Sequence, residues 1–157
     1  MLNKLLSSFQ KKASLSPKKS REFITAMNAA VAALDTQKIK QLLQPHRKWL
    51  KMSYYDFYSE CLKEFTFYTQ NTYPTTIESV TLFDTQCIFC ELGCRVQGFK
   101  ILYKETHEHG IQVVRSDRLG IVYKLTDGRL TDLQWCHKFL SEDEINDIKL
   151  IDHATKK

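Results

Sequence analysis

Residues 76–105 read TIESVTLFDTQCIFCELGCRVQGFKILYKE, and this stretch decides the fold of the second half of the chain. From Thr76 onward the apolar side chains recur with a period of two, and β-branched and aromatic residues dominate, as is typical of strands. The same pattern continues to Phe139. We therefore expect a four-stranded antiparallel meander with strands at residues 77–90, 94–105, 111–125 and 129–139.

The first hairpin is predicted from the loop Glu91–Gly93, in which Gly93 takes the left-handed conformation that glycine adopts without strain. A three-residue loop at this place puts Cys90 opposite Cys94. The cross-strand pairs that follow are Phe83–Ile101, Thr81–Tyr103, Thr85–Phe99 and, on the outer face, Asp84–Lys100.

The last hairpin contains Asp127-Gly128, a dipeptide that favours a two-residue turn. That turn would mix the faces of the two strands, whereas a three-residue loop at 126–128 pairs Ile121 with Leu133 and gathers the apolar side chains on one face. Because a slip of one residue turns every side chain over, the apolar face decides the choice. We predict the three-residue loop.

The two middle strands are predicted to turn near Gly110. In the strand that follows, the polar run Ser116–Arg118 interrupts the apolar pattern, so we expect a bulge or a break there.

Three helices are predicted before the sheet. Ser16 precedes Pro17, so a capping side chain followed by proline begins the first helix, whose apolar stripe ends near Leu34. Asp35 or Thr36 caps a second, shorter helix that ends at Pro45. The third helix begins at the capping box 53–56 and carries a broad aromatic stripe.

The composition is that of one globular domain. The chain has 157 residues, of which 43% are hydrophobic and 26% are charged, with five glycines and three prolines. No apolar run is long enough for a membrane span, so we expect a soluble, cytoplasmic protein. We divide the chain into an N-terminal arm (1–15), a single α+β domain (16–140) and an acidic C-terminal tail (141–157).

Positive charge is concentrated at the N-terminal end. Residues 1–51 hold eleven lysines and arginines against only Glu22 and Asp35. Such a segment could bind phosphates or an anionic surface, but solvated helix faces give the same count. Neither interleaved aromatic residues nor a recognisable nucleic-acid module accompanies the cluster, so nucleic acid is not an expected partner.

The order of elements resembles the nuclear transport factor 2-like superfamily, the cone-shaped α+β fold of ketosteroid isomerase and scytalone dehydratase. FITAMNAAVAALDTQKIKQLLQP (23–45) looks like the opening helix, the break and the short second helix of that family. VYKLTDGRLTDLQWCHKF (122–139) looks like its closing hairpin. The resemblance implies about three helices packed on a curved, mostly antiparallel sheet of four or more strands, a cavity between sheet and helices, and a homodimer.

Family enzymes use tyrosine, aspartate or histidine side chains in this cavity to donate and accept protons. No aspartate of this sequence matches the catalytic position of the family, so we assign no catalytic residue. The predicted cavity side carries Phe83, Phe99, Ile101, Ile121, Leu133 and Phe139. We expect the ligand-binding residues to be Tyr58, Tyr103, Tyr123, Trp135 and His137.

Three functions are compatible with this prediction, and the fold alone does not choose among them. The favoured one is a non-catalytic binding or accessory module for a small apolar ligand or a protein partner. The first alternative is an isomerase- or dehydratase-like enzyme that uses His137 with Tyr103 or Tyr123, because an unperturbed histidine suits proton transfer at neutral pH. The second is a zinc-stabilised protein or a basic protein that binds an anionic surface. We expect no cofactor.

Five cysteines raise the question of a zinc site, because thiolates and imidazoles are the ligands that tetrahedral zinc prefers. In a regular meander, however, Cys136 on the fourth strand would lie on the order of 14 Å from Cys87 on the first. We therefore expect no structural metal. Cys90 and Cys94 would face each other as a redox-sensitive pair or as two thiols, and Cys61 is expected in the core.

Overall fold

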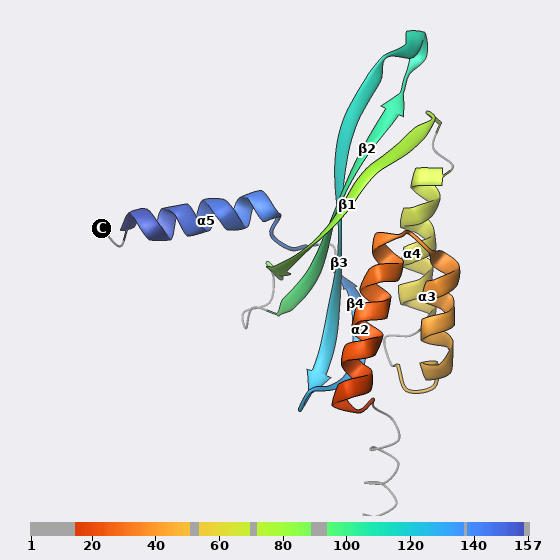
Figure 1. Ribbon diagram of the computed structural model, residues 1–157, viewed down its shortest axis with the longest axis vertical. Coiled ribbons are helices and arrows are strands. Elements are labelled where there is room, and N and C mark those ends of the chain that lie inside the picture. The colour runs from red at the N-terminus through yellow and green to blue at the C-terminus, as the bar shows by residue number, and fades with distance from the viewer. Residues whose placement is uncertain (1–14, 51–53, 70–71, 89–93, 137, 156–157) are drawn as a thin grey trace, which may run out of the picture. The chain divides into compact units, whose positions relative to one another are not determined.

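The computed structural model describes residues 15–50, 54–69, 72–88, 94–136 and 138–155 of the chain (Figure 1). It confirms an α+β fold in which helices precede an antiparallel sheet of strand order β1-β2-β3-β4. The elements are α2 (Pro17–Ala32), α3 (Thr36–Leu43), η1 (Gln44–His46), α4 (Tyr54–Thr69), β1 (Thr75–Gln86), β2 (Arg95–Thr106), η2 (Glu108–Gly110), β3 (Gln112–Thr126), β4 (Arg129–Cys136) and α5 (Glu142–Thr155).

Two compact units divide the chain. The first comprises residues 1–67 and 123–134, and the second comprises residues 68–122 and 135–157.

The helix boundaries of the first unit follow the predicted caps. Ser16 accepts a hydrogen bond from the Lys19 amide at 3.2 Å, and Pro17 occupies the first turn of α2. Asp35 accepts a hydrogen bond from the Lys38 amide at 3.0 Å and caps α3. The predicted starts of both helices are therefore confirmed. The third helix begins at Tyr54, within the predicted capping box 53–56, and Ser53 of that box lies outside the described residues.

The first unit is held together by polar contacts as well as by its apolar core. The Ser20 hydroxyl is buried and accepts a hydrogen bond from the Leu130 amide at 2.8 Å, which joins α2 to β4. The Tyr123 hydroxyl donates to Oδ1 of Asn28 at 2.7 Å and joins α2 to β3. The buried side chains include Met27, Val31, Ile39, Leu43, Phe57 and the predicted core residue Cys61.

A two-residue turn connects β3 to β4, so the predicted three-residue loop is wrong. Thr126 ends β3, Arg129 begins β4, and the residues between them, Asp127 and Gly128, have φ angles of 52° and 75°. Two consecutive positive φ angles define the turn whose twist matches that of flanking strands. The preference of Asp127-Gly128 for a two-residue turn thus outweighs the gathering of apolar side chains on one face, on which the prediction depended.

The register between β1 and β2 differs from the prediction by three residues. Phe83 is paired with Gly98, and Val80 takes the place opposite Ile101. Cys87, not Cys90, lies opposite Cys94, and the Cys87 amide donates to the Cys94 carbonyl at 3.0 Å. The connection is longer than a tight loop, and its residues 89–93, with Cys90, lie outside the described residues.

The pairing of β2 with β3 is regular from Gln97–Ile121 to Thr106–Gln112. Leu102 is the partner of Ser116, so the predicted bulge or break at residues 116–118 is wrong. The predicted turn near Gly110 is confirmed, because Gly110 ends η2 with a φ angle of 74°.

A small apolar cluster covers one face of the second unit's sheet. Phe99 and Tyr103 lie on the other face of the same sheet. The shift of β1 by an odd number of residues turns its side chains over, so Phe83 belongs to this cluster and not to the Tyr103 side as predicted. Phe139, also predicted on the Tyr103 side, packs here too. The members of the cluster are Phe83, Cys87, Val96, Val122, Cys136 and Phe139.

After β4 the chain crosses to the end of β1. Phe139 forms an antiparallel bridge with Cys87, and the Ile88 amide donates to the Lys138 carbonyl at 3.1 Å. The acidic tail then forms α5, whose N-terminus is a capping box: the Glu144 amide donates to Ser141 Oγ at 3.1 Å, and the Ser141 amide donates to Glu144 Oε2 at 3.4 Å. In the part of the chain that the structure describes, no helix is both long and apolar enough to cross a membrane.

Candidate functional site

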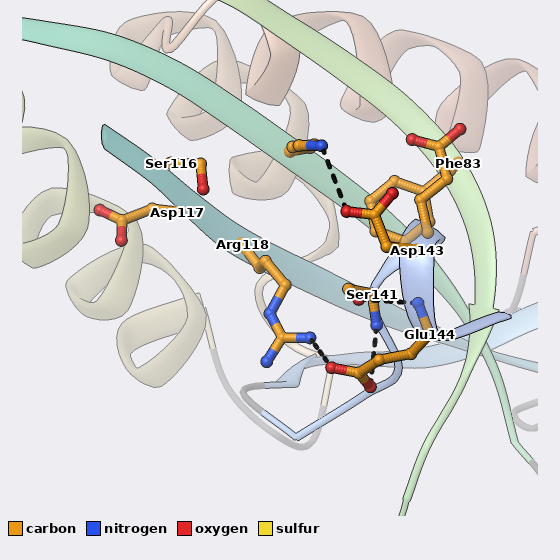
Figure 2. A pocket seen from close by; sticks show the side chains of 9 residues that line it. Phe83, Ser116, Asp117, Arg118, Ser141, Asp143 and Glu144 are labelled. Atoms are coloured by element: carbon orange, nitrogen blue, oxygen red, sulfur yellow. Dashed lines mark hydrogen bonds and ion pairs between the residues drawn. The ribbon is translucent and has the colours of Figure 1, made fainter. Parts of the chain in front are cut away.

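A polar groove of about 310 Å³ lies in the second unit between the sheet and the first turn of α5 (Figure 2). Its floor carries Lys100 of β2 and Arg118 of β3, which are direct cross-strand partners. The groove is lined by Phe83, Lys100, Ser116, Asp117, Arg118, Ser141, Glu142, Asp143 and Glu144. Two cations and an aromatic ring therefore face a row of carboxylates.

The first turn of α5 supplies the counter-charges of both cations. Lys100 Nζ lies 4.0 Å from Asp143 Oδ2, and Arg118 Nη1 lies 3.4 Å from Glu144 Oε1. The carboxylate of Glu144 serves two purposes, because its other oxygen caps the helix through Ser141. The Asp143 side chain is 83% exposed, so water screens its ion pair strongly.

Arg118 is oriented by Phe139 as well as by Glu144. Its Nη1 donates to the Phe139 carbonyl at 3.3 Å, and its guanidinium carbon lies 5.6 Å from the centre of the Phe139 ring. Phe139 is almost fully buried. The guanidinium is thus held in place by the core of the sheet, and a ligand would meet a cation that is already positioned.

A second polar cluster surrounds the buried carboxylate of Glu105 on the other face of the sheet. Glu105 Oε2 lies 2.9 Å from His107 Nε2 and 3.1 Å from Arg115 Nε. The hydrogen bond from His107, followed by the bond and the charge of Arg115, lowers the pKa of Glu105. The ring of Tyr73 stacks on His107 with 3.9 Å between the centroids. These contacts hold the carboxylate in its charged form.

Two tyrosines and an aspartate extend this cluster. The Tyr68 hydroxyl donates to Asp117 Oδ2 at 2.9 Å, and the Tyr68 and Tyr103 rings meet edge to face at 5.2 Å. Burial raises the pKa of Tyr103, and the negative charge of Asp117 raises it further. Figure 2 shows the Asp117 carboxylate pointing away from the groove. Tyr103 therefore remains a neutral phenol at neutral pH.

The predicted ligand-binding residues are divided between the two units. Tyr58 and Tyr123 belong to the first unit, in which burial raises the pKa of Tyr123 and its hydroxyl is bonded to Asn28. Tyr103 and Trp135 belong to the second unit, and both lie outside the set of residues that lines the groove. His137 lies outside the described residues.

The sequence interpretation missed the residues of the groove. It assigned Lys100 to an ion pair with Asp84, whereas Asp84 is paired with Gln97 and accepts a hydrogen bond from its side-chain amide. One signal was available: Ser141 followed three residues later by Glu144 is a helix-start pattern. The approach of that helix to Lys100 had no signal in the sequence.

The structure also overturns the distance argument about the cysteines. Cys136 belongs to the apolar cluster against which Cys87 packs. The chain crosses from β4 to β1, so strand order does not separate the two residues. Among the described residues no group of three or more histidine, cysteine or acidic side chains is placed to hold a metal ion.

Comparisons of the chain with protein-family models, with curated proteins and with solved structures gave no match.

Proposed function

We propose that this chain is a non-catalytic binding module that holds an acidic segment of a protein partner in the groove over Lys100 and Arg118. The observation that carries the proposal is the pairing of these two cations on adjacent strands. Like charges directly opposite each other destabilise a sheet unless an anion compensates them. In this chain, carboxylates of the first turn of α5 compensate them.

The carboxylates of α5 are replaceable. Both ion pairs join exposed side chains, and such pairs contribute about 0–1 kcal/mol each. A partner that presents two carboxylates on one helical turn offers the same counter-charges. Phe83 adds an apolar surface, and Ser116 adds a hydroxyl. An acidic segment with an apolar side chain beside its carboxylates therefore fits the groove.

A peptide with the sequence of residues 141–149, SEDEINDIK, is a suitable probe, because it carries the carboxylates that occupy the groove. We expect the double variant Asp143→Asn/Glu144→Gln to bind this peptide more tightly than the wild-type protein, since its own α5 no longer competes. Isothermal titration at low salt measures the affinity, which should fall as salt is added.

Charge-matched variants test where the peptide binds. In the double-variant background, Lys100→Gln and Arg118→Gln should each weaken binding. Lys104→Gln is the control, because Lys104 lies on the same strand and pairs with Glu78 instead of α5. Equal binding by Arg118→Gln and Lys104→Gln, or equal binding of a peptide whose acidic residues are replaced by amides, would refute the proposal.

Three further expectations from the sequence remain proposals. The nuclear transport factor 2-like relationship is supported by the order of helices and strands and by the antiparallel meander. A homodimer is supported by the exposed apolar side chains Val114 and Leu82 of the sheet, and light scattering tests it. A cytoplasmic location, and a small apolar ligand in place of a protein partner, rest on the sequence.

A further inference from the structure

Cys87 and Cys136 approach each other because the chain crosses from β4 to the end of β1. Both are free thiols, and Cys87 packs against the apolar cluster that contains Cys136. Cys136 Sγ also donates to the Lys138 carbonyl at 3.7 Å, and the same carbonyl accepts the Ile88 amide at 3.1 Å. These bonds to one carbonyl hold the segment after β4 against the end of β1, next to both cysteines.

We propose that Cys87 and Cys136 form a dithiol site that low-molecular-weight disulfides, such as oxidised glutathione, convert to an intramolecular disulfide. The inference is independent of the peptide groove. Three observations carry it: the packing of Cys87 against the cluster of Cys136, the bridge between Cys87 and Phe139, and the different exposure of the two cysteines.

The reaction proceeds by two exchange steps. The Cys87 thiol loses its proton to solvent and attacks one sulfur of the reagent, which forms a mixed disulfide and expels one thiolate. Cys136 then loses its proton and attacks Cys87 Sγ, which forms the protein disulfide and expels the second thiolate. Two protons leave the protein, and its two electrons reduce one molecule of reagent to two thiols.

The environment of each sulfur assigns these roles. Cys87 is half-buried and can be reached by the reagent, whereas Cys136 is 8% exposed and packs against Phe139 and Val122. Burial raises the pKa of Cys136. The second step should therefore become faster as pH rises, since only the thiolate attacks a disulfide.

Cys94 is the competing residue, because it lies directly opposite Cys87 and is exposed. Directly opposed residues in a ladder place their Cβ atoms about 4.5–5.5 Å apart, which is wider than the mean of about 3.8 Å in disulfides. Cys136, in contrast, is not held in a ladder pair with Cys87, and the two side chains pack in one apolar cluster. We therefore expect the bridge to form with Cys136.

The test is to incubate the full chain with oxidised glutathione, to alkylate the remaining thiols under denaturing conditions and to map the peptides by mass spectrometry. We expect a species that has lost two hydrogens, with peptides containing Cys87 and Cys136 cross-linked. Its thermal midpoint should exceed that of the reduced protein and return on addition of dithiothreitol. A bridge from Cys87 to Cys90 or Cys94, or a glutathione adduct that persists at Cys87, would overturn the inference.

Serine variants separate the two roles. Cys136→Ser should accumulate the mixed disulfide at Cys87, because no thiol resolves it, and Cys87→Ser should form neither adduct nor bridge at Cys136. Cys94→Ser and Cys61→Ser are the controls and should still form the bridge. Loss of the bridge in Cys94→Ser would contradict the assignment. The peptide map of the wild-type chain decides the question if a variant fails to fold.

Discussion

Gly98 of β2 and Gly120 of β3 are direct antiparallel partners, and a phenylalanine ring lies over each of them. The Phe83 ring covers Gly98, and the Phe139 ring covers Gly120, with 6.2 Å between the ring centroids. The absence of both Cβ atoms lets the rings lie directly on the backbone of the sheet. Phe139, seated in this way, also orients Arg118 at the floor of the groove.

The two glycines should differ in their tolerance of a methyl group. A Cβ at Gly120 would lie 2.7 Å from the buried Phe139 ring and 2.9 Å from the Cys136 carbonyl oxygen, so Gly120→Ala should lower the free energy of unfolding by about 1–3 kcal/mol. At Gly98 the three atoms nearest to the Cβ all belong to the half-buried Phe83 ring, which can move, so Gly98→Ala should cost less. Urea unfolding at unchanged m-value measures both, and a larger loss for Gly98→Ala would contradict this explanation.

Ser20 is predicted to be the most sensitive polar residue of α2. Its hydroxyl is the acceptor for the buried Leu130 amide, so Ser20→Ala leaves that donor without its bond and should cost about 1–3 kcal/mol. The exposed Ser79→Ala is a matched control and should stay within about 0.5 kcal/mol of wild type. Chemical denaturation of the two variants gives the comparison, and equal stabilities would show that the Ser20 bond contributes nothing.

The cluster around Glu105 predicts that the protein loses stability at acid pH. Because His107 and Arg115 lower the pKa of Glu105 in the folded state, its contribution is complete above the unfolded pKa of about 4.3. The contribution is lost as pH falls through the lower, folded pKa. Glu105→Gln should therefore lose stability at neutral pH and show a flatter decline below about pH 4.3. Denaturation midpoints measured from neutral pH to below about pH 4.3 give the dependence of stability on pH for each variant, with the exposed Glu78→Gln as control.

Tyr123 predicts that the protein loses stability at alkaline pH. Burial raises its pKa above the ordinary value of about 10, so the folded state keeps the proton that the unfolded state releases. Its contribution is complete below about pH 10 and is lost as pH rises from there toward the folded pKa. Tyr123→Phe should remove this alkaline loss of stability. At neutral pH the variant should lose about 0.5–1.5 kcal/mol of the free energy of unfolding, because the bond to Asn28 is lost. An unchanged alkaline decline in the variant would refute the assignment.

The predicted parts of the fold depend on local signals. Ser16 and Asp35 are capping residues whose side chains reach an amide three residues ahead, so each marks a helix start without reference to the rest of the chain. The period of two located all four strands to within a few residues. The register was less predictable, since it depends on a long connection after β1 and on the preference of Asp127-Gly128 for a tight turn.

The candidate site was the least predictable part. The prediction of Tyr103, Tyr123, Trp135 and His137 depends on one face of an assumed strand register, and that of Tyr58 on the aromatic stripe of the third helix. The structure divides four of them between two units, and the fifth lies outside the described residues. Lys100 and Arg118 lie together in a groove only because they are cross-strand partners and because the first turn of α5 lies against both side chains.

The sequence by itself determined the class of fold, the helix starts and the positions of the strands, because caps and hydrophobic periods act between residues a few positions apart. Only the tertiary structure decided which face Phe83 occupies, that Cys136 meets Cys87, and that the acidic turn of α5 meets Lys100 and Arg118. Each of these contacts joins residues that are distant in the chain, and one shift of register redirects every side chain of a strand. Such contacts are fixed by the packing of the whole unit.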